Sequence, residues 1–207
     1  MGILRFISNP INLVYFVIAI LVAITVHEFL HAWTANYLGD STPKLAGRVS
    51  LNPLVHLDPL GTLALLLIGI GWGKPVPINP NNFKNPRLGS ALTGLAGPLA
   101  NLLLAMALAV IYRFTTLPTF AGNLILATIY FNIVLMIFNL VPIPPLDGSH
   151  LLALIFPQIE DPKLQQYGPI VLVAFLILGG FAIISPIIIL IINMLGININ
   201  QLAFLFA

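Results

Sequence analysis

The sequence predicts an all-α membrane protein: a multi-pass bundle of transmembrane helices with a re-entrant, irregular segment between the first and second full spans. Of its 207 residues, 59% are hydrophobic and only 7% are charged, and the mean hydropathy is +1.04. Soluble domains carry about 25% charged residues, so lipid must surround most of this chain. The length suits one compact bundle, and we expect residues 1–207 to form a single domain.

The predicted spans follow from four long apolar segments. Each is long enough to cross about 30 Å of hydrocarbon as a helix. They comprise residues 13–38, 88–114, 124–141 and 170–195. The last segment contains Gly179, Gly180 and Pro186, which we expect to bend or break its helix.

A fifth apolar run, residues 60–70, is too short for a full span. It follows Pro59 and precedes Gly71 and Gly73, so we expect a re-entrant or interfacial segment. The surrounding stretch, residues 47–86, is rich in Pro, Gly and Asn. Irregular backbone at membrane depth is tolerated only where it is buried in protein or lines a wet cavity. This stretch is therefore a candidate wall of a functional site.

An H-E-x-x-H sequence at residues 27–31 lies within the first predicted helix. Its spacing places His27 and His31 on one face, one turn apart, where both can bind a single zinc ion. Glu28 then lies beside the metal and can move a proton between water and a leaving amine. A chance match is the alternative. However, ionisable groups in membrane helices are costly and usually functional, and no Lys or Arg occurs between Arg5 and Lys44 to pair with this glutamate.

A catalytic zinc takes a third protein ligand and keeps one position open. The chain has no cysteine, and no Glu occurs between Glu28 and Glu160, which excludes a zincin with a glutamate ligand a few turns after the motif. Thr34 and Tyr37 occupy the positions where a metzincin has Gly and His. The remaining candidates for the third ligand are Asp147, Asp58, His56 and His150.

Asp147 belongs to a proline-rich stretch, residues 139–148, directly after the third predicted span. Prolines prevent simple continuation of the helix and leave backbone groups free to line a site. Taken alone, the Leu-Asp-Gly sequence is better explained by a surface turn in which Asp147 caps the next helix.

Three stretches together resemble the site-2 protease family of intramembrane zinc metalloproteases: residues 27–31, residues 94–101 and residues 139–148. The branch suggested is the compact bacterial or archaeal one, without PDZ or CBS domains. The resemblance implies one zinc ion per chain, transmembrane proteins as substrates, and a site of five residues. These are the ligands His27, His31 and Asp147, the catalytic acid/base Glu28, and Asn139 near the reacting carbonyl.

The zinc site constrains the topology. If residues 60–70 return to their starting side, Asp147 reaches the same side of the membrane as the C-terminal end of the first helix. Six of the eight basic residues fall on that side, and the positive-inside rule makes it cytoplasmic. They are Lys44, Arg48, Lys74, Lys84, Arg87 and Lys163, whereas Arg5 and Arg113 fall on the other side. We therefore expect a multi-pass protein of the cell membrane with its metal nearer the cytoplasmic face.

Other polar and small residues have simpler expected roles. Asn101 and Asn132 are expected to form hydrogen bonds between helices, and Gly94 and Gly97 to allow close helix packing. For His56 three roles remain open: a fourth zinc ligand, a substrate contact or an anchor of its loop. The extended residues 71–77 are a candidate edge for pairing with an unwound substrate.

Two other functions compete with proteolysis: a metal transporter or sensor, and an inactive binding homologue. A transporter lines its path with ionisable groups from several helices. The second and fourth predicted spans contain no acidic residue and no His, and Glu28 is intact, so the protease is favoured over both. The net charge of +2 is too small to indicate a nucleic-acid partner.

Overall fold

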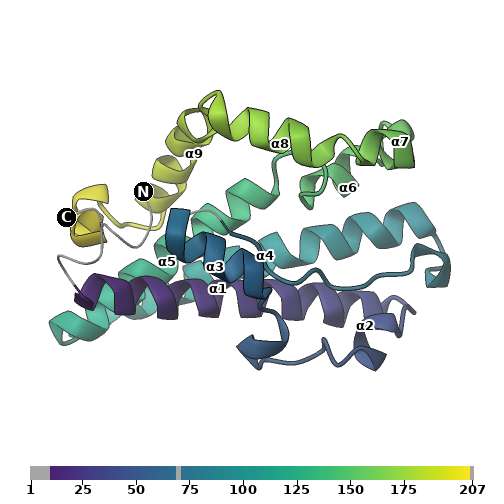
Figure 1. The fold of residues 1–207 in the computed structure, drawn as a ribbon. Coiled ribbons are helices and arrows are strands. Elements are labelled where there is room, and N and C mark those ends of the chain that lie inside the picture. The colour runs from purple at the N-terminus through teal and green to yellow at the C-terminus, as the bar shows by residue number, and fades with distance from the viewer. Residues whose placement is uncertain (1–9, 69–70, 206–207) are drawn as a thin grey trace.

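A computed structural model describes residues 10–68 and 71–205. Three long helices form the body of the protein: α1 (Pro10–Tyr37), α4 (Pro86–Phe114) and α5 (Thr119–Asn139). They lie side by side along a common direction (Figure 1), and each is long and apolar enough to cross a membrane. The first three predicted spans are thus confirmed, although α5 begins several residues before the predicted start of its span.

Small residues let these three helices approach closely. Ala19 of α1, Ala105 of α4 and Ala127 of α5 are fully buried in one core, where Ile129 and Ile133 of α5 fill the space between them. Membrane helices associate by such close packing, because lipid tails are as apolar as the side chains themselves.

The stretch between α1 and α4 folds back on itself. Its short helix α3 (Pro59–Ile68) begins beside the residues that follow it, since Leu57 pairs with Gly73 in an antiparallel bridge. We call the residues that return after α3 the returning limb. Gly61 of α3 and Gly71 of this limb are so close that a Cβ atom on either would overlap the backbone of the opposite segment. The start of α3 and the returning limb therefore lie side by side, as expected for a re-entrant segment. Residues 69–70 of the predicted segment lie outside the described residues.

The ends of this stretch are fastened together by Asp40, which follows α1 and is fully buried. Its carboxylate accepts hydrogen bonds from the backbone N–H of Asn79 at 2.7 Å, the side-chain amide of Asn82 at 2.7 Å and the hydroxyl of Thr42 at 2.5 Å. Burial opposes ionisation, but these hydrogen bonds outweigh it and hold the pKa of Asp40 below its ordinary value. The short elements of this stretch besides α3 are α2 (Thr42–Leu45), η2 (Pro53–Val55) and η3 (Pro80–Asn82).

The fourth predicted span is broken. Gly179, with a left-handed φ of 89°, separates α8 (Gly168–Ile177) from α9 (Gly180–Met194), and the two parts are bent by 75°. Gly179 is therefore the break that the sequence predicted, whereas Pro186 lies within α9. Helix α9 packs on α5, while α8 extends from α9 toward α7 along the upper edge of the view (Figure 1). The remaining elements are α6 (Gly148–Leu152), η4 (Pro157–Glu160), α7 (Pro162–Gln165) and η5 (Ile199–Leu205).

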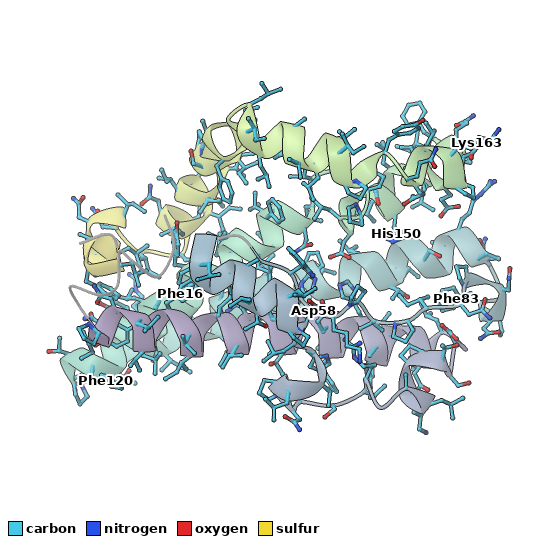
Figure 2. The ribbon with its side chains drawn as sticks, viewed as in Figure 1. Phe16, Asp58, Phe83, Phe120, His150 and Lys163 are labelled. Carbon is cyan, nitrogen blue, oxygen red and sulfur yellow. The ribbon has the colours of Figure 1, made fainter. Side chains whose placement is uncertain are left out.

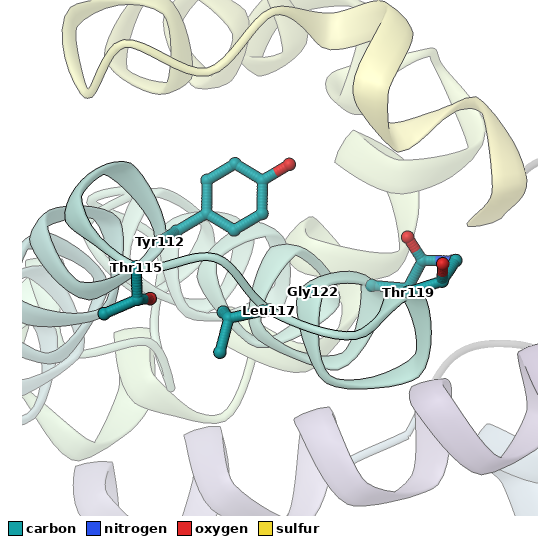
Figure 3. Close-up of a pocket in the computed structure, with 6 residues that line it drawn as sticks. Tyr112, Thr115, Leu117, Thr119 and Gly122 are labelled. Atoms are coloured by element: carbon teal, nitrogen blue, oxygen red, sulfur yellow. The ribbon is translucent and has the colours of Figure 1, made fainter.

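The two ends of the bundle differ in character. Figure 2 shows Phe83 and Lys163 at one end and Phe120 at the other. At the Phe120 end, where α4 turns into α5, a cavity of about 370 Å³ opens (Figure 3). It is lined by Tyr112, Thr115, Leu117, Thr119, Gly122 and Asn123. This lining contains no carboxylate and no imidazole, so the cavity lacks the residues needed for the predicted chemistry.

Candidate metal centre

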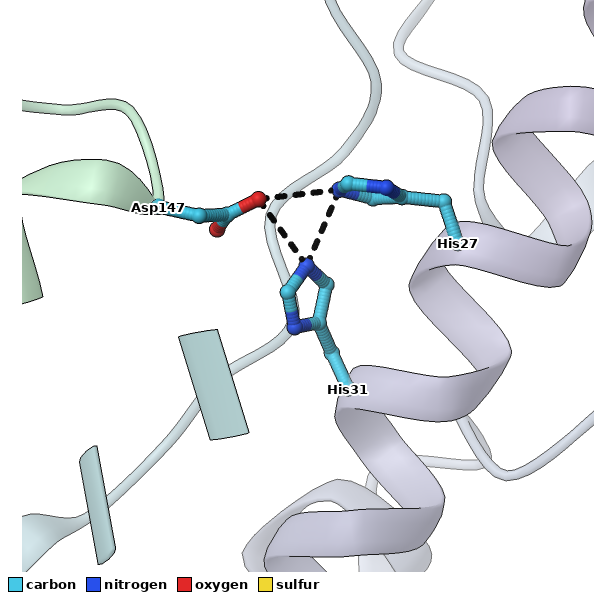
Figure 4. Close-up of side chains that lie close together, drawn as sticks. All are labelled: His27, His31 and Asp147. Carbon is cyan, nitrogen blue, oxygen red and sulfur yellow. Dashed lines mark hydrogen bonds and ion pairs between the residues drawn. The ribbon is translucent and has the colours of Figure 1, made fainter. Parts of the chain in front are cut away.

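Three side chains from distant parts of the chain converge inside the bundle. His27 and His31 come from one face of α1, and Asp147 comes from the loop before α6 (Figure 4). Nε2 of His27 lies 2.9 Å from Nε2 of His31, and Oδ2 of Asp147 lies 3.1 Å from the first nitrogen and 3.3 Å from the second. Zinc bonds of about 2.0–2.1 Å in a tetrahedral site place ligand atoms about 3.3 Å apart, so the three distances suit such a site.

The proton on His31 is fixed by its other ring nitrogen. Nδ1 lies 2.6 Å from the carbonyl oxygen of Thr93, which can only accept a hydrogen bond. Nδ1 must therefore carry the hydrogen, which leaves a lone pair on Nε2 of the neutral ring. That lone pair faces the other two ligand atoms.

A chain of amides fixes the proton on His27 in the same way. Nδ1 of His27 lies 2.7 Å from Oδ1 of Asn101, whose amide nitrogen donates to the carbonyl of Ala23 at 3.0 Å and to Oδ1 of Asn132 at 2.7 Å. The Asn132 amide in turn donates to the carbonyl of Thr128 at 2.7 Å. With both amides oriented, Oδ1 of Asn101 is an acceptor and Nδ1 of His27 is its donor.

Two imidazole lone pairs and a carboxylate oxygen thus meet at one point without a hydrogen to share. Oδ2 of Asp147 is buried and receives no hydrogen bond. A buried hydrogen-bond acceptor without a donor costs free energy. A bound cation would compensate this cost for all three converging acceptor atoms. The side chain of Asp147 also forms no capping hydrogen bond with α6, so the alternative of a helix cap is not supported. The donor set fits zinc.

Two glycines of α4 make room for this centre. A Cβ atom on Gly97 would overlap the rings of His27 and His31, and one on Gly94 would lie 3.2 Å from the carbonyl oxygen of Asp147. Close helix packing, the role expected for these residues, is therefore incomplete as an explanation. Their missing side chains leave the space in which the ligands meet.

Glu28 follows His27 in α1 and does not belong to the ligand cluster. Its Oε2 is 4.0 Å from Nη2 of Arg48, and its Oε1 is 3.5 Å from the position of a Cβ atom on Gly73. The carboxylate therefore lies between α1 and the limb that returns from α3.

The other candidates have different partners. Oδ1 of Asp58 accepts the backbone N–H of Gly61 at 2.7 Å, so Asp58 caps α3. His56 is fully buried, and its Nε2 donates to the carbonyl of Ser50 at 2.7 Å. Of its three open roles, these contacts favour the loop anchor. His150 lies close to Gly94 and outside the ligand cluster.

Asn139 is directed to its own helix. Its amide nitrogen donates to the carbonyl of Leu135 at 3.0 Å. The structure therefore shows no placement of Asn139 beside the three ligands, and its role near the reacting carbonyl stays a prediction.

Comparison with known proteins supports these observations. Residues 116–179, which include Asp147, match peptidase family M50. The chain is 40% identical over 184 residues to "Putative zinc metalloprotease YwhC" of Bacillus subtilis (strain 168), covering 84% of each protein. It is 34% identical over 137 residues to "Putative zinc metalloprotease Rip2" of Mycolicibacterium smegmatis, covering 62% of this chain and 52% of that protein. No solved structure matches.

The YwhC relationship extends far beyond the matched family segment, and the three converging side chains suit the metal named in both relatives. The candidate metal centre lies in a protein whose long helices are apolar enough to cross a membrane. The chain belongs to peptidase family M50 and is an intramembrane zinc metalloprotease.

Proposed function

We propose that His27, His31 and Asp147 hold the zinc ion and that Glu28 is the catalytic acid/base. The observation that carries this proposal is the convergence of three ligand atoms without hydrogens, 2.9 to 3.3 Å from one another and so close to the spacing of a tetrahedral zinc site. Glu28 follows His27 directly and stands outside the ligand set, which is the position that proton transfer requires.

When bound, the zinc ion acts as a Lewis acid and makes water nucleophilic at neutral pH. Glu28 accepts a proton from the attacking water as its oxygen bonds to the peptide carbonyl carbon. The carboxyl group then gives this proton to the amide nitrogen as the C–N bond breaks. One water is consumed, and a carboxylic acid and an amine are released, while Glu28 regains its charge.

Asn139 is proposed to hold the reacting carbonyl oxygen. An amide group has two N–H donors, and the hydrogen bond with Leu135 uses one of them. The second donor remains for a substrate oxygen, which becomes more negative as water attacks.

The substrates are proposed to be transmembrane segments that have locally unwound, because the peptide bonds of an intact helix are shielded. Gly73 lies in the extended limb after α3 and close to Glu28. In the described part of the chain, neither its N–H nor its carbonyl has a backbone partner. An extended substrate that pairs with this edge would bring its own backbone to the carboxylate.

The site is proposed to lie nearer the cytoplasmic face of the cell membrane, in a multi-pass chain that forms one domain over residues 1–207. Exposed lysines at the Asp40 end of the bundle support this orientation by the positive-inside rule. They include Lys44, Lys74 and Lys84. Arg5, which is expected on the opposite side of the membrane, lies outside the described residues.

The test is a cleavage assay in liposomes with a model transmembrane substrate, combined with metal analysis. Wild type should contain about one zinc ion per chain and should lose cleavage with a chelator and regain it with zinc. Alanine at His27, His31 or Asp147 should lower zinc occupancy. Full zinc retention in Asp147→Ala would contradict its role as a ligand.

A further inference from the structure

Arg48 is a buried charged residue that the proposed reaction does not use. Only 3% of its surface is exposed, although the three residues before it, 45–47, are all exposed. Its Nη1 donates to the carbonyl of Pro75 at 2.8 Å, and its Nη2 donates to the carbonyl of Lys74. Nη2 also lies 3.4 Å from Nδ1 of His56 and 4.0 Å from Oε2 of Glu28.

Stability alone does not explain this arginine. Burial of a guanidinium group is costly, and a well-packed apolar residue often stabilises as well as a buried ion pair. Nε of Arg48 is buried without a hydrogen-bond partner, which adds to the cost. The arrangement is expensive, yet it places one rigid group between the catalytic carboxylate and the limb that carries the free edge.

The limb around Gly73 is held by two sets of contacts. The N–H of Lys74 donates to the carbonyl of His56 at 2.8 Å. The Arg48 side chain donates hydrogen bonds to the carbonyls of Lys74 and Pro75. A guanidinium group is a planar fork that can serve two carbonyls and face a carboxylate at once, whereas a lysine ammonium is a single point charge. Arg48 thereby connects the limb to Glu28 in one geometry.

We propose that Arg48 is a positioning residue that fixes the edge at Gly73 against Glu28 and so selects which peptide bond of a paired substrate is cut. This inference rests on the proposed function, because it requires a substrate strand on that edge. A shift of the limb by one residue would present a neighbouring peptide bond to Glu28.

The first test identifies the bond that is cut. Arg48→Ala should lower kcat by about 10²-fold, the cost of a reacting group misplaced by about 1 Å. Mass spectrometry of the products should show cleavage spread over neighbouring bonds, and added methylguanidinium should restore both the rate and the single position. Arg48→Lys should restore less, and Lys84→Met, an exposed basic residue at the same end, should behave as wild type. A merely structural role would give slower cleavage at the unchanged bond, with lower zinc content, and would overturn the proposal.

The second test does not depend on activity. The chain has no cysteine, so Lys74→Cys with Val110→Cys provides two unique sites for spin labels, one on the limb and one on α4. The distance distribution between them should be narrow with Arg48 present and should broaden or shift in Arg48→Ala. An unchanged distance distribution in Arg48→Ala would overturn the proposal that Arg48 fixes this limb. Absence of zinc-dependent cleavage by wild type would instead contradict the proposed function, and the distances would still decide the role of Arg48.

Discussion

His27 and Asn101 are joined by a hydrogen bond of 2.7 Å between Nδ1 and Oδ1, although 74 positions separate them in the chain. This bond connects α1 to α4 at the depth of the metal centre. Because the Asn101 amide is itself oriented by Ala23 and Asn132, the bond determines which nitrogen of His27 has a free lone pair.

Replacement of Asn101 should therefore weaken zinc binding. In Asn101→Leu the ring of His27 loses the acceptor that selects its tautomer, and groups that orient a metal ligand typically contribute 10–100-fold in affinity. We expect a loss of that size in competition with a chromogenic chelator. Asn123→Ala, in the cavity at the other end of the bundle, is the control. Equal affinity of Asn101→Leu and wild type would contradict the orienting role.

Gly97→Ala should abolish zinc binding and cleavage, because the added methyl group would overlap both imidazoles. Gly122→Ala is a matched control, since its Cβ atom would lie 3.7 Å from the ring of Tyr112, in ordinary contact. The measurement is zinc content and cleavage rate of the two purified variants. A Gly97→Ala protein with normal zinc content would mean that the centre has more room than the described geometry allows.

Asp40 should stabilise the protein in a pH-dependent way. Its pKa is lowered in the folded state, so its contribution is complete above the ordinary aspartate pKa of about 3.9 and is lost as the pH falls through the folded-state value. Asp40→Asn loses charge-assisted hydrogen bonds, each worth about 1.5–3 kcal/mol. Thermal unfolding in detergent should show a lower Tm for Asp40→Asn at neutral pH and a smaller difference from wild type below pH about 4. A difference that stays constant over this range would contradict an ionised Asp40.

The proposed orientation predicts the location of fused reporters. A reporter in the loop after Lys44 and one after Val141 should both read cytoplasmic, because the re-entrant segment keeps these positions on one side. A reporter near Thr116, at the opposite turn, should read extracytoplasmic. A reversed pattern would contradict the charge argument, and opposite sides for the first two positions would contradict the re-entrant segment.

The sequence was sufficient to predict the long helices, the break near Gly179 and the pairing of His27 with His31, because these depend on local length, composition and helical spacing. The residues alone leave Asp147, Asp58, His56 and His150 open as the third ligand, since only the folded loops decide which side chain reaches α1, and the resemblance to site-2 proteases implies Asp147. The contact of Arg48 with Glu28 had no signal in the sequence.

For Asn101 and Gly97 the sequence predicts only simpler roles, for a related reason. An amide in an apolar span and a glycine in a row of small residues look alike whether they serve packing or a site. Their partners are the rings of His27 and His31, which lie on another helix far away in the chain.

Glu28→Gln separates binding from catalysis. The substitution preserves size and removes the base, while His27, His31 and Asp147 remain to hold the metal, so zinc content and thermal stability should stay close to wild type. Cleavage should fall by at least the 10²–10⁴-fold that proton transfer typically contributes, because both the attacking water and the leaving nitrogen depend on this carboxylate. The measurement is cleavage of a membrane-embedded substrate by zinc-loaded wild type and Glu28→Gln at equal protein. Near-equal rates would show that another group is the base or that the chain is an inactive binding homologue, whereas loss of zinc would show that Glu28 also supports the ligands.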